Sequence, residues 1–479
     1  MIKYLQIFVV LVFSLIEVSA QDSMIYNIID DVSSERIEKD ITKLVSFGTR
    51  HTLSDTISKT RGIGAARRWI KKEFEKISNN CGDCLDVFYE KSYVTSETYN
   101  EPSPRERIIF PTWIYNVVAV QRGTKFPNRY IIMSGDIDSR ISDPTNYLDD
   151  SPGANDNASG MAGTIEAARV LSQYKFDNSI IYVGLSGEEQ GLLGGKSLAK
   201  YGKQKGWDMI GILNNDMIGN IEGVDGVIDN RSFRIFSEPF FFNSKYSNKL
   251  NMRTGGGEND GDSRQLARYV HKIVKKYMPE LNPIMIYRLD RFGRGGHHRP
   301  FNDEGIAGIR IMEAHENYNR QHNDIRTENG VEYGDVISGV NFNYAAKLTA
   351  VNAISLAMIA SSPKPPKNLK IGGIVEPSVK FKWDRPDDSS IVGYKIYWRE
   401  TTSSTWDNSR TIDDTNSFTL NGIVIDNFIF GISSVNSKGF ESIVAFPQGT
   451  FRDWLYKSLI FHPIIIIDFG NISTPRVMK

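Results

Sequence analysis

Two adjacent glutamates, Glu188 and Glu189, follow the apolar run 180–185 after a short Ser-Gly turn. An unbroken run of strand-forming residues is typical of a strand buried on both faces of a parallel sheet. Ligands of such sheets bind just beyond the carboxyl ends of the strands, where this pair would lie. One glutamate there can bind a metal while the other moves a proton. The alternative interpretation is that both acids only complement the dipole of the helix that follows.

A serine-hydrolase interpretation of the same stretch is weaker. Residues 184–188 follow the G-x-S-x-G nucleophile elbow until its fifth position, where Glu188 replaces glycine.

Two more apolar runs also end in carboxylates. Residues 130–133 lead to Asp136 and Asp138, and residues 209–213 lead to Asp216. Right-handed crossovers bring the carboxyl ends of parallel strands to one edge of a sheet. We therefore expect these acids to lie near the glutamate pair.

Two loops supply further candidate ligands. Asp156 lies in the Gly/Asn-rich loop 151–160, where an aspartate before a helix is by default an N-cap or turn residue. His322 lies in a polar loop, where the alternative is a merely solvated side chain. A two-metal site needs a bridging acid, one more acid and one imidazole on each metal, and an unligated acid as proton shuttle. The candidate residues supply most of that set.

Helices and strands must bring these side chains together. Helical spacing and apolar runs predict helices over 32–47, 61–77, 264–278 and 343–360, a helix after Asp156, and further strands over 114–120 and 307–312. Residues 220–262 have the composition of loops. His51 lies in a polar loop, so we expect it to be solvated and assign it no role.

The length and charge of the chain limit the classes of function. A chain of 479 residues suggests at least two domains. Lys and Arg together number 57, as do Asp and Glu, so the net charge is zero. This balance gives no indication of a nucleic-acid partner or of binding to an anionic membrane.

The N-terminus predicts export. Lys3 precedes an apolar stretch, and Val18-Ser19-Ala20 completes a pattern that fits a signal peptide over 1–20, cleaved after Ala20. The apolar stretch is short for a membrane span, so a retained anchor is the weaker alternative. A secreted or periplasmic protein meets oxidising conditions, where Cys81 and Cys84 are expected to form a disulfide. Two cysteines are too few for a four-thiolate zinc site.

A proline-rich linker, 362–366, separates two kinds of pattern. Short alternating strands follow it, with Trp383 and Tyr394 placed as the buried aromatics of a small β-sandwich. Residues 365–448 resemble a fibronectin type III domain, which implies a spacer or a platform that binds a surface or polymer. The tail 449–479 fits neither domain, and its proline and short length argue against a membrane span.

Five motifs in register extend the argument to residues 35–360. The order DIDSR, PGANDNASG, GLSGEEQGLLGG, LNNDMIGN and NRQHNDIR is similar to that of zinc-dependent aminopeptidases typified by secreted bacterial leucine aminopeptidases. Their relatives include glutamate carboxypeptidase and the glutaminyl cyclases. The resemblance implies a metallopeptidase domain over 21–361, with a mixed, mainly parallel central sheet flanked by helices. It also implies hydrolysis of N-terminal bonds in peptide or protein substrates, although the carboxypeptidases leave the end that is cut open.

The resemblance also implies roles for single residues. By position, Asp156 would bridge two divalent metals, Glu188 would be the general base, Glu189 and His322 would complete one metal site, Asp216 would join Asp156 at the other, and Asp138 would steady a metal ligand. The metals implied are two ions of zinc.

Two positions depart from the family pattern. Asp136 stands where the family usually has His, which favours a harder ion such as manganese at that position, or weak occupancy. His297 stands where the family more often has Asp. We hypothesise that His297 compensates for the missing imidazole; the alternative is that it only lines the pocket or forms a nearby hydrogen bond.

Three functions therefore remain open from the sequence. The leading prediction is an exported metallo-aminopeptidase with two metals. A single-zinc transferase similar to glutaminyl cyclase needs only Asp156, Glu189 and His322. A non-catalytic, peptidase-like binding protein is the third, although such a protein would have no chemical need for Glu188.

Overall fold

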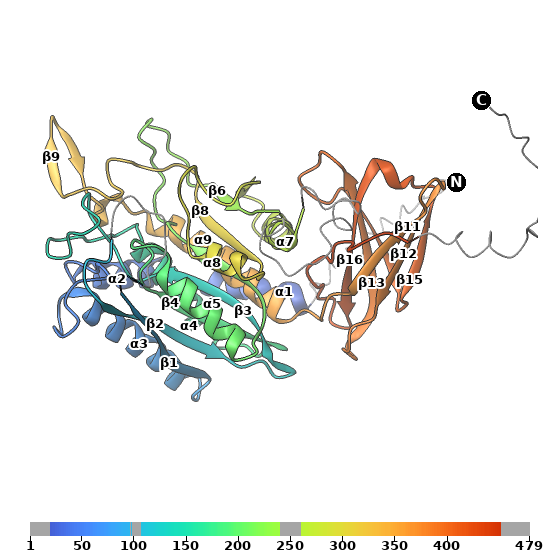
Figure 1. Cartoon of the computed structure of the whole chain (residues 1–479), viewed down its shortest axis with the longest axis horizontal. Coiled ribbons are helices and arrows are strands. Elements are labelled where there is room, and N and C mark those ends of the chain that lie inside the picture. The colour runs from blue at the N-terminus through green and yellow to red at the C-terminus, as the bar shows by residue number, and fades with distance from the viewer. Residues whose placement is uncertain (1–19, 96, 98–106, 240–259, 452–479) are drawn as a thin grey trace, which may run out of the picture.

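The computed structural model describes residues 20–95, 97, 107–239 and 260–451. The expected signal peptide, except for Ala20, and the tail beyond residue 451 lie outside the described residues. The described chain forms an α/β body followed by an all-β sandwich, which lies to the right in Figure 1. In these described ranges, no helix has both the length and the apolar character needed to cross a membrane.

An eight-stranded sheet organises the α/β body, with strand order β1-β2-β4-β3-β5-β8-β6-β7. The central pairs β3–β4, β3–β5 and β5–β8 are parallel, whereas β1 and β2 extend one edge in antiparallel fashion. The sheet is therefore mixed and mainly parallel at its centre, as predicted. Its strands are β1 (Leu85–Val94), β2 (Thr112–Gln121), β3 (Phe126–Asp136), β4 (Asn178–Leu185), β5 (Asp208–Asn215), β6 (Ser232–Phe236), β7 (Asn282–Ile286) and β8 (Gly308–Glu313).

Helices cover both faces of this sheet. Helices α4 and α9 pack on one face with α1 and α2 outside them, α3 packs on β1 and β2, and α5 packs beside α8 on the other face. The helices are α1 (Ala20–Asp31), α2 (Ser34–Val45), α3 (Gly62–Asn80), α4 (Ala158–Leu171), α5 (Leu193–Gln204), α7 (Asp262–Tyr277), α8 (His298–Asp303) and α9 (Phe342–Ala360).

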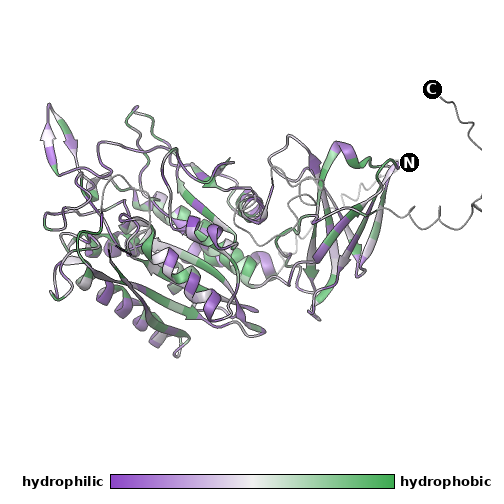
Figure 2. Cartoon of the chain, in the orientation of Figure 1, coloured by the Kyte–Doolittle hydropathy of each residue, from purple (hydrophilic) through white to green (hydrophobic). Residues whose placement is uncertain are grey.

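Strand β4 has the burial that its apolar sequence predicts. Ile180 and Tyr182 belong to the core on one side of the sheet, while Ile181 and Val183 belong to the core on the other side. Because side chains alternate along a strand, a strand covered on both faces must be apolar at every position. Figure 2 shows the green, apolar strands inside the body.

Two expectations from the sequence need correction. Residues 220–262 are not only loop, because they contain β6. His51 is not solvated: it is fully buried, and its Nδ1 accepts a hydrogen bond from the backbone N–H of Leu53 at 3.1 Å. Its Nε2 lies 3.0 Å from the carbonyl oxygen of Pro144. The helix predicted over 32–47 is confirmed as α2, whereas α1, which precedes it, was not predicted.

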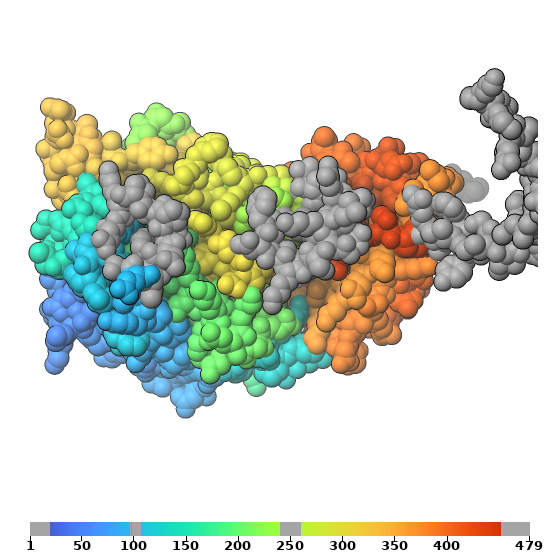
Figure 3. All heavy atoms as spheres, viewed as in Figure 1, coloured from blue at the N-terminus to red at the C-terminus, as the bar shows by residue number. Residues whose placement is uncertain are grey.

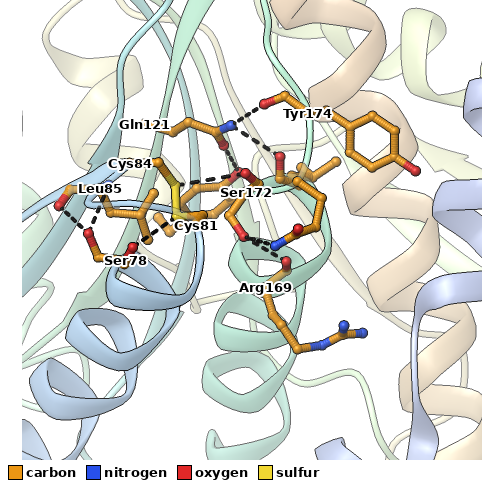
Figure 4. Close-up of a disulfide and its surroundings, with 11 residues drawn as sticks. Ser78, Cys81, Cys84, Leu85, Gln121, Arg169, Ser172 and Tyr174 are labelled. Carbon is orange, nitrogen blue, oxygen red and sulfur yellow. Dashed lines mark hydrogen bonds between the residues drawn. A yellow bond between two sulfur atoms is a disulfide. The ribbon is translucent and has the colours of Figure 1, made fainter.

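The expected disulfide is present. Cys81 and Cys84 are joined between the end of α3 and the start of β1 (Figure 4). Beside it, the hydroxyl of Ser78 donates to the carbonyl of Leu85 at 2.9 Å and accepts from its N–H at 3.1 Å. The turn between helix and strand is therefore held by both a covalent bond and a pair of hydrogen bonds.

The C-terminal part is an all-β sandwich, as predicted. Two three-stranded antiparallel sheets, β11-β12-β15 and β14-β13-β16, enclose a separate apolar core. Trp383 and Tyr394 are buried in it with ring centroids 5.1 Å apart. Its strands are β11 (Lys367–Gly372), β12 (Ser378–Asp384), β13 (Ile391–Glu400), β14 (Asn408–Asp413), β15 (Ser417–Asn421) and β16 (Phe428–Asn436). Figure 3 shows this orange and red lobe packed against the rest of the chain.

Candidate metal centre

The carboxyl ends of β3, β4 and β5 meet at one edge of the sheet. The parallel register aligns Asp136 with Leu185 and Gly135 with Asn215. The acids that follow these strands are thereby placed together, as the sequence predicts. Helix α4 begins at the same edge, and its N-cap Asn157 accepts a hydrogen bond from the N–H of Gly160 at 3.1 Å.

Asp156, Glu189 and His322 form the group best suited to a metal. One nitrogen or oxygen from each lies within 4.8 Å of the others, and this is the metal-type group found within the described ranges. His322 Nε2 lies 2.9 Å from Asp156 Oδ2 and 3.0 Å from Glu189 Oε1. Zinc binds carboxylate oxygens and imidazole nitrogens, and catalytic zinc sites have three protein ligands, so the donor chemistry of this triad fits such an ion.

Charges around this triad compensate one another. Burial lowers the pKa of His322, but the charges of Glu189 and Asp156 outweigh it and raise the pKa to about 9. Burial raises the pKa of Glu189, but His322 and Arg140 hold it well below its usual range. Both triad carboxylates are therefore ionised at neutral pH, which is the form that binds a metal.

Arg140 is a triad neighbour that sequence reasoning missed. Its Nε donates to Glu189 Oε2 at 2.7 Å, and its Nη2 lies 2.6 Å from His322 Nδ1. A neutral ring that gives one nitrogen to a metal keeps its hydrogen on the other. Because Arg140 can only donate, it would have to turn away from Nδ1 if His322 bound a metal through Nε2.

Asp138 fixes the backbone of the glutamate pair. It accepts hydrogen bonds from the backbone N–H of Glu188 at 3.2 Å and of Glu189 at 3.0 Å, and from the hydroxyl of Thr52 at 3.1 Å. Asp335, which the sequence did not single out, holds the Asp156 loop in the same way, since it accepts the Asp156 N–H at 2.7 Å. The backbone around each acidic ligand is thus fixed by another buried acid.

Asp136 and His297 pair with each other rather than with the triad. His297 Nδ1 lies 2.5 Å from Asp136 Oδ1, and Asn157 Nδ2 donates to Asp136 Oδ2 at 2.7 Å. Burial raises the pKa of Asp136 to about 8 and lowers that of His297 to about 4, so a charge on either side chain is disfavoured. Neither residue belongs to the metal-type group or lines the cavity at the triad.

Asp216 pairs with a buried arginine that the sequence analysis did not consider. Arg310, on β8, lies with its Nη2 2.9 Å from Asp216 Oδ2, and its Nε donates to the Asp216 carbonyl at 2.6 Å. Its Nη1 donates to Asp290 Oδ2 at 2.7 Å. An arginine inside the apolar run 306–312 was the available signal, because a buried charge requires a partner.

Glu188 lines the cavity at the triad but is not one of the three triad residues. The cavity is lined by Asp156, Glu188, Glu189, Asp216 and His322, with Arg140 and Arg291 among its basic residues. Burial raises the pKa of Glu188 well above its usual value, and the charges of Asp216 and Glu189 add to the effect. A carboxyl with a raised pKa in such a cavity is suited to accept and return a proton.

Comparisons with known proteins agree on one family. The family model described as peptidase family M28 matches residues 116–336. A protein of Pyrenophora tritici-repentis named probable zinc metalloprotease is 36% identical over 437 residues, which cover 90% of this chain and 99% of that protein. A probable zinc metalloprotease of Leptosphaeria maculans is 38% identical over 432 residues, with 89% and 98% covered.

Solved structures show the same fold. The Legionella pneumophila LapA aminopeptidase matches with a TM-score of 0.51 and 18% sequence identity. The match covers 73% of this chain and 77% of that chain. At this identity the likeness concerns the arrangement of helices and strands.

Proposed function

The chain belongs to peptidase family M28, and we propose that this metallopeptidase is an exported aminopeptidase that uses Glu188 as its general base. One observation carries the proposal. A metal-type triad and a separate carboxyl with a raised pKa line the same cavity. Metal-assisted hydrolysis requires both a set of metal ligands and a separate group that carries a proton.

Asp156, Glu189 and His322 would hold a zinc ion. The ion, when bound, supplies a Lewis acid that lowers the pKa of a coordinated water. The carboxylate of Glu188 takes a proton from the attacking water and returns it to the leaving amine. Asp138 contributes by fixing the backbone of both glutamates, so that the two carboxylates keep their separate tasks.

The end of the peptide that is cut can be tested directly. We expect hydrolysis of aminoacyl-nitroanilides with a free amino group, and no hydrolysis of their N-acetylated forms. Cleavage of the acetylated forms at an equal rate would contradict an aminopeptidase.

The role of Glu188 is tested by Glu188→Gln, which keeps size and hydrogen bonding but removes the base. We expect activity to fall by a factor on the order of 100 or more, with zinc content unchanged. Glu328→Gln, the same change on an exposed strand, is the control and should match the wild type. Full activity in Glu188→Gln would exclude Glu188 as the base.

One observation favours a second candidate, a single-zinc transferase similar to glutaminyl cyclase. The described residues bring together one triad, Asp156, Glu189 and His322, while Asp136 is paired elsewhere. A peptide with N-terminal glutamine separates the two functions, because cyclisation releases ammonia and hydrolysis releases free glutamine. Ammonia release without free glutamine would replace the aminopeptidase proposal.

A further inference from the structure

We infer that Arg310 takes the place of the second metal ion in this chain, so that only the triad of Asp156, Glu189 and His322 binds a metal. The inference rests on the proposed function of that triad. The resemblance places a second ion among Asp136, Asp156 and Asp216. The side chains observed at that position do not fit an ion, because the buried guanidinium of Arg310 contacts Asp216, and Asp136 is paired with His297 and Asn157.

Asp216 is engaged by Arg310 from two directions. Arg310 binds the carboxylate with Nη2 at 2.9 Å and the backbone carbonyl of the same residue with Nε at 2.6 Å. The guanidinium is fully buried, and Asp290, also buried, anchors its other side at 2.7 Å. The carbonyl of Gly295 accepts a further hydrogen bond from Nη1 at 2.8 Å.

Both oxygens of Asp136 contact other side chains. Its Oδ1 lies 2.5 Å from His297 Nδ1 and its Oδ2 accepts from Asn157 at 2.7 Å. Asn157 in turn donates to the carbonyl of Asn215 at 2.7 Å, which ties this arrangement to the end of β5. His297 does not belong to the metal-type group: its Nδ1 contacts Asp136, and its Nε2 is buried without a hydrogen-bond partner.

The positive charge of Arg310 can replace that of a metal ion beside Asp216. An arginine is always protonated in proteins, so Arg310 is a permanent cation beside Asp216. Burial lowers the pKa of Arg310, but the charges of Asp216 and Asp290 outweigh it and keep the pKa above its usual value. A divalent ion beside Asp216 would lie close to this buried cation, and the repulsion between the two positive charges disfavours the ion. Arg310 is therefore a positioning residue that orients Asp216 next to the general base.

The first test is metal content. After loading with excess zinc and gel filtration, mass spectrometry should find about one ion per wild-type chain. His322→Ala should reduce this to near zero, while Asp216→Asn should leave it at about one. Two ions per wild-type chain, or the loss of an ion in Asp216→Asn, would overturn the inference.

The second test rebuilds the second metal site. The exchange Asp136→His with His297→Asp returns the family pattern, and Arg310→Leu removes the guanidinium. We expect the exchange alone to bind one ion and the triple variant to bind about two. A folded triple variant that still binds one would contradict the assignment to Arg310. Arg129→Leu is the matched control, because it removes another buried arginine of the same sheet and should add no ion.

Location gives an independent measurement that does not depend on the variants. Anomalous scattering at the zinc edge from wild-type crystals should give one peak, among Asp156, Glu189 and His322. A second peak beside Asp216 would overturn the inference even if hydrolysis is normal. Absence of both metal and hydrolysis would instead remove the proposed function, so the two failures are distinguishable.

Discussion

At the residue scale, His322 is the shared partner of the two acidic ligands. It lies 2.9 Å from Asp156 and 3.0 Å from Glu189, and Arg140 binds the remaining oxygen of Glu189. The two carboxylates are nearly buried, so each requires a cation or a donor nearby. In this structure, side chains provide those partners.

Metal removal is therefore expected to leave the protein folded. Chelation should abolish peptidase activity while circular dichroism at neutral pH stays unchanged, because His322 and Arg140 remain paired with the acids.

His322→Ala should behave differently from metal removal. With the ring gone, Asp156 and Glu189 face each other with one guanidinium, which we expect to lower the free energy of unfolding by about 1–3 kcal/mol. Equal stability of the chelated wild type and the chelated variant would contradict this account.

Asp40 predicts a pH dependence of stability away from the active site. It is 6% exposed, and its Oδ2 has no hydrogen-bond partner. Burial raises its pKa to about 7, with a contribution from the charge of Glu73. The folded chain thus holds a proton that the unfolded chain releases near pH 4, so stability should fall as pH rises from about 4 to about 7.

Asp40→Asn should remove this dependence. We expect the variant to match the wild type near pH 4 and to exceed it at pH 8 by an amount on the order of 2 kcal/mol. Urea unfolding at both pH values measures the difference. Glu38→Gln, an exposed position on the same helix, is the control and should change neither curve. A variant no more stable than the wild type at pH 8 would refute the argument.

At the scale of elements, the position of Asp156 depends on how closely α4 approaches the sheet. A Cβ on Gly160 would lie 2.2 Å from the carbonyl oxygen of Asn215, the last residue of β5. A Cβ on Gly135 would lie 2.4 Å from the backbone of Gly160. Only glycine fits at both places, so the start of α4 is in backbone contact with the strands whose ends carry the other acids.

Gly160→Ala is expected to displace the start of α4 and, with it, Asp156. Overpacking of this kind typically costs about 1–3 kcal/mol of stability. We also expect zinc affinity to fall about tenfold, which corresponds to about 1.4 kcal/mol. Thermal melts and calorimetric titration measure the two effects.

The control is Gly206→Ala, at a positive φ of 68° with no atom within 4 Å of the added Cβ. It should cost about 1 kcal/mol through backbone strain alone. Its zinc affinity should equal that of the wild type. If Gly160→Ala bound zinc as tightly as this control, close helix packing would not be what positions Asp156.

Among the strands of the central sheet, the sequence predicted those that contain a continuous apolar run and missed β1, β6 and β7. Strands β3, β4 and β5 were found because burial on both faces leaves a continuous apolar run. Strand β1 contains Asp86, Glu90 and Lys91, and β7 contains a proline, so neither gives that signal. Strand β6 is only five residues long.

The sequence predicted which acids and histidine form the candidate site, but not the arginines with which the acids form ion pairs. The resemblance supplied Asp156, Glu189 and His322, which the structure brings together. It could not supply the pairing of Arg140 or Arg310 with an acid: Arg310 inside an apolar run indicates a buried charge, but the sequence does not show which distant acid it contacts. Arg310 lies 94 residues from Asp216 in the chain.

At the scale of the whole molecule, the sandwich is bound to the α/β body by buried charges. Asp260 is fully buried and accepts from Arg268 at 2.6 Å on one oxygen and from Arg399 at 2.9 Å on the other. Arg268 belongs to α7 and Arg399 to β13, so one aspartate joins the two parts. The hydroxyl of Tyr269 on α7 also donates to the carbonyl of Glu441 at 2.8 Å.

Arg399→Met should loosen this interface. The substitution keeps most of the apolar volume but leaves Asp260 with one cation, and breaking a buried pair typically costs about 3–5 kcal/mol. We expect a melting temperature several degrees lower and faster tryptic cleavage near the proline-rich linker, followed by mass spectrometry of the fragments. Arg410→Met, the same change at an exposed position of β14, should alter neither. If both variants resisted trypsin equally, the sandwich would be held by its apolar contacts and the linker, and the buried charges would only fix its orientation.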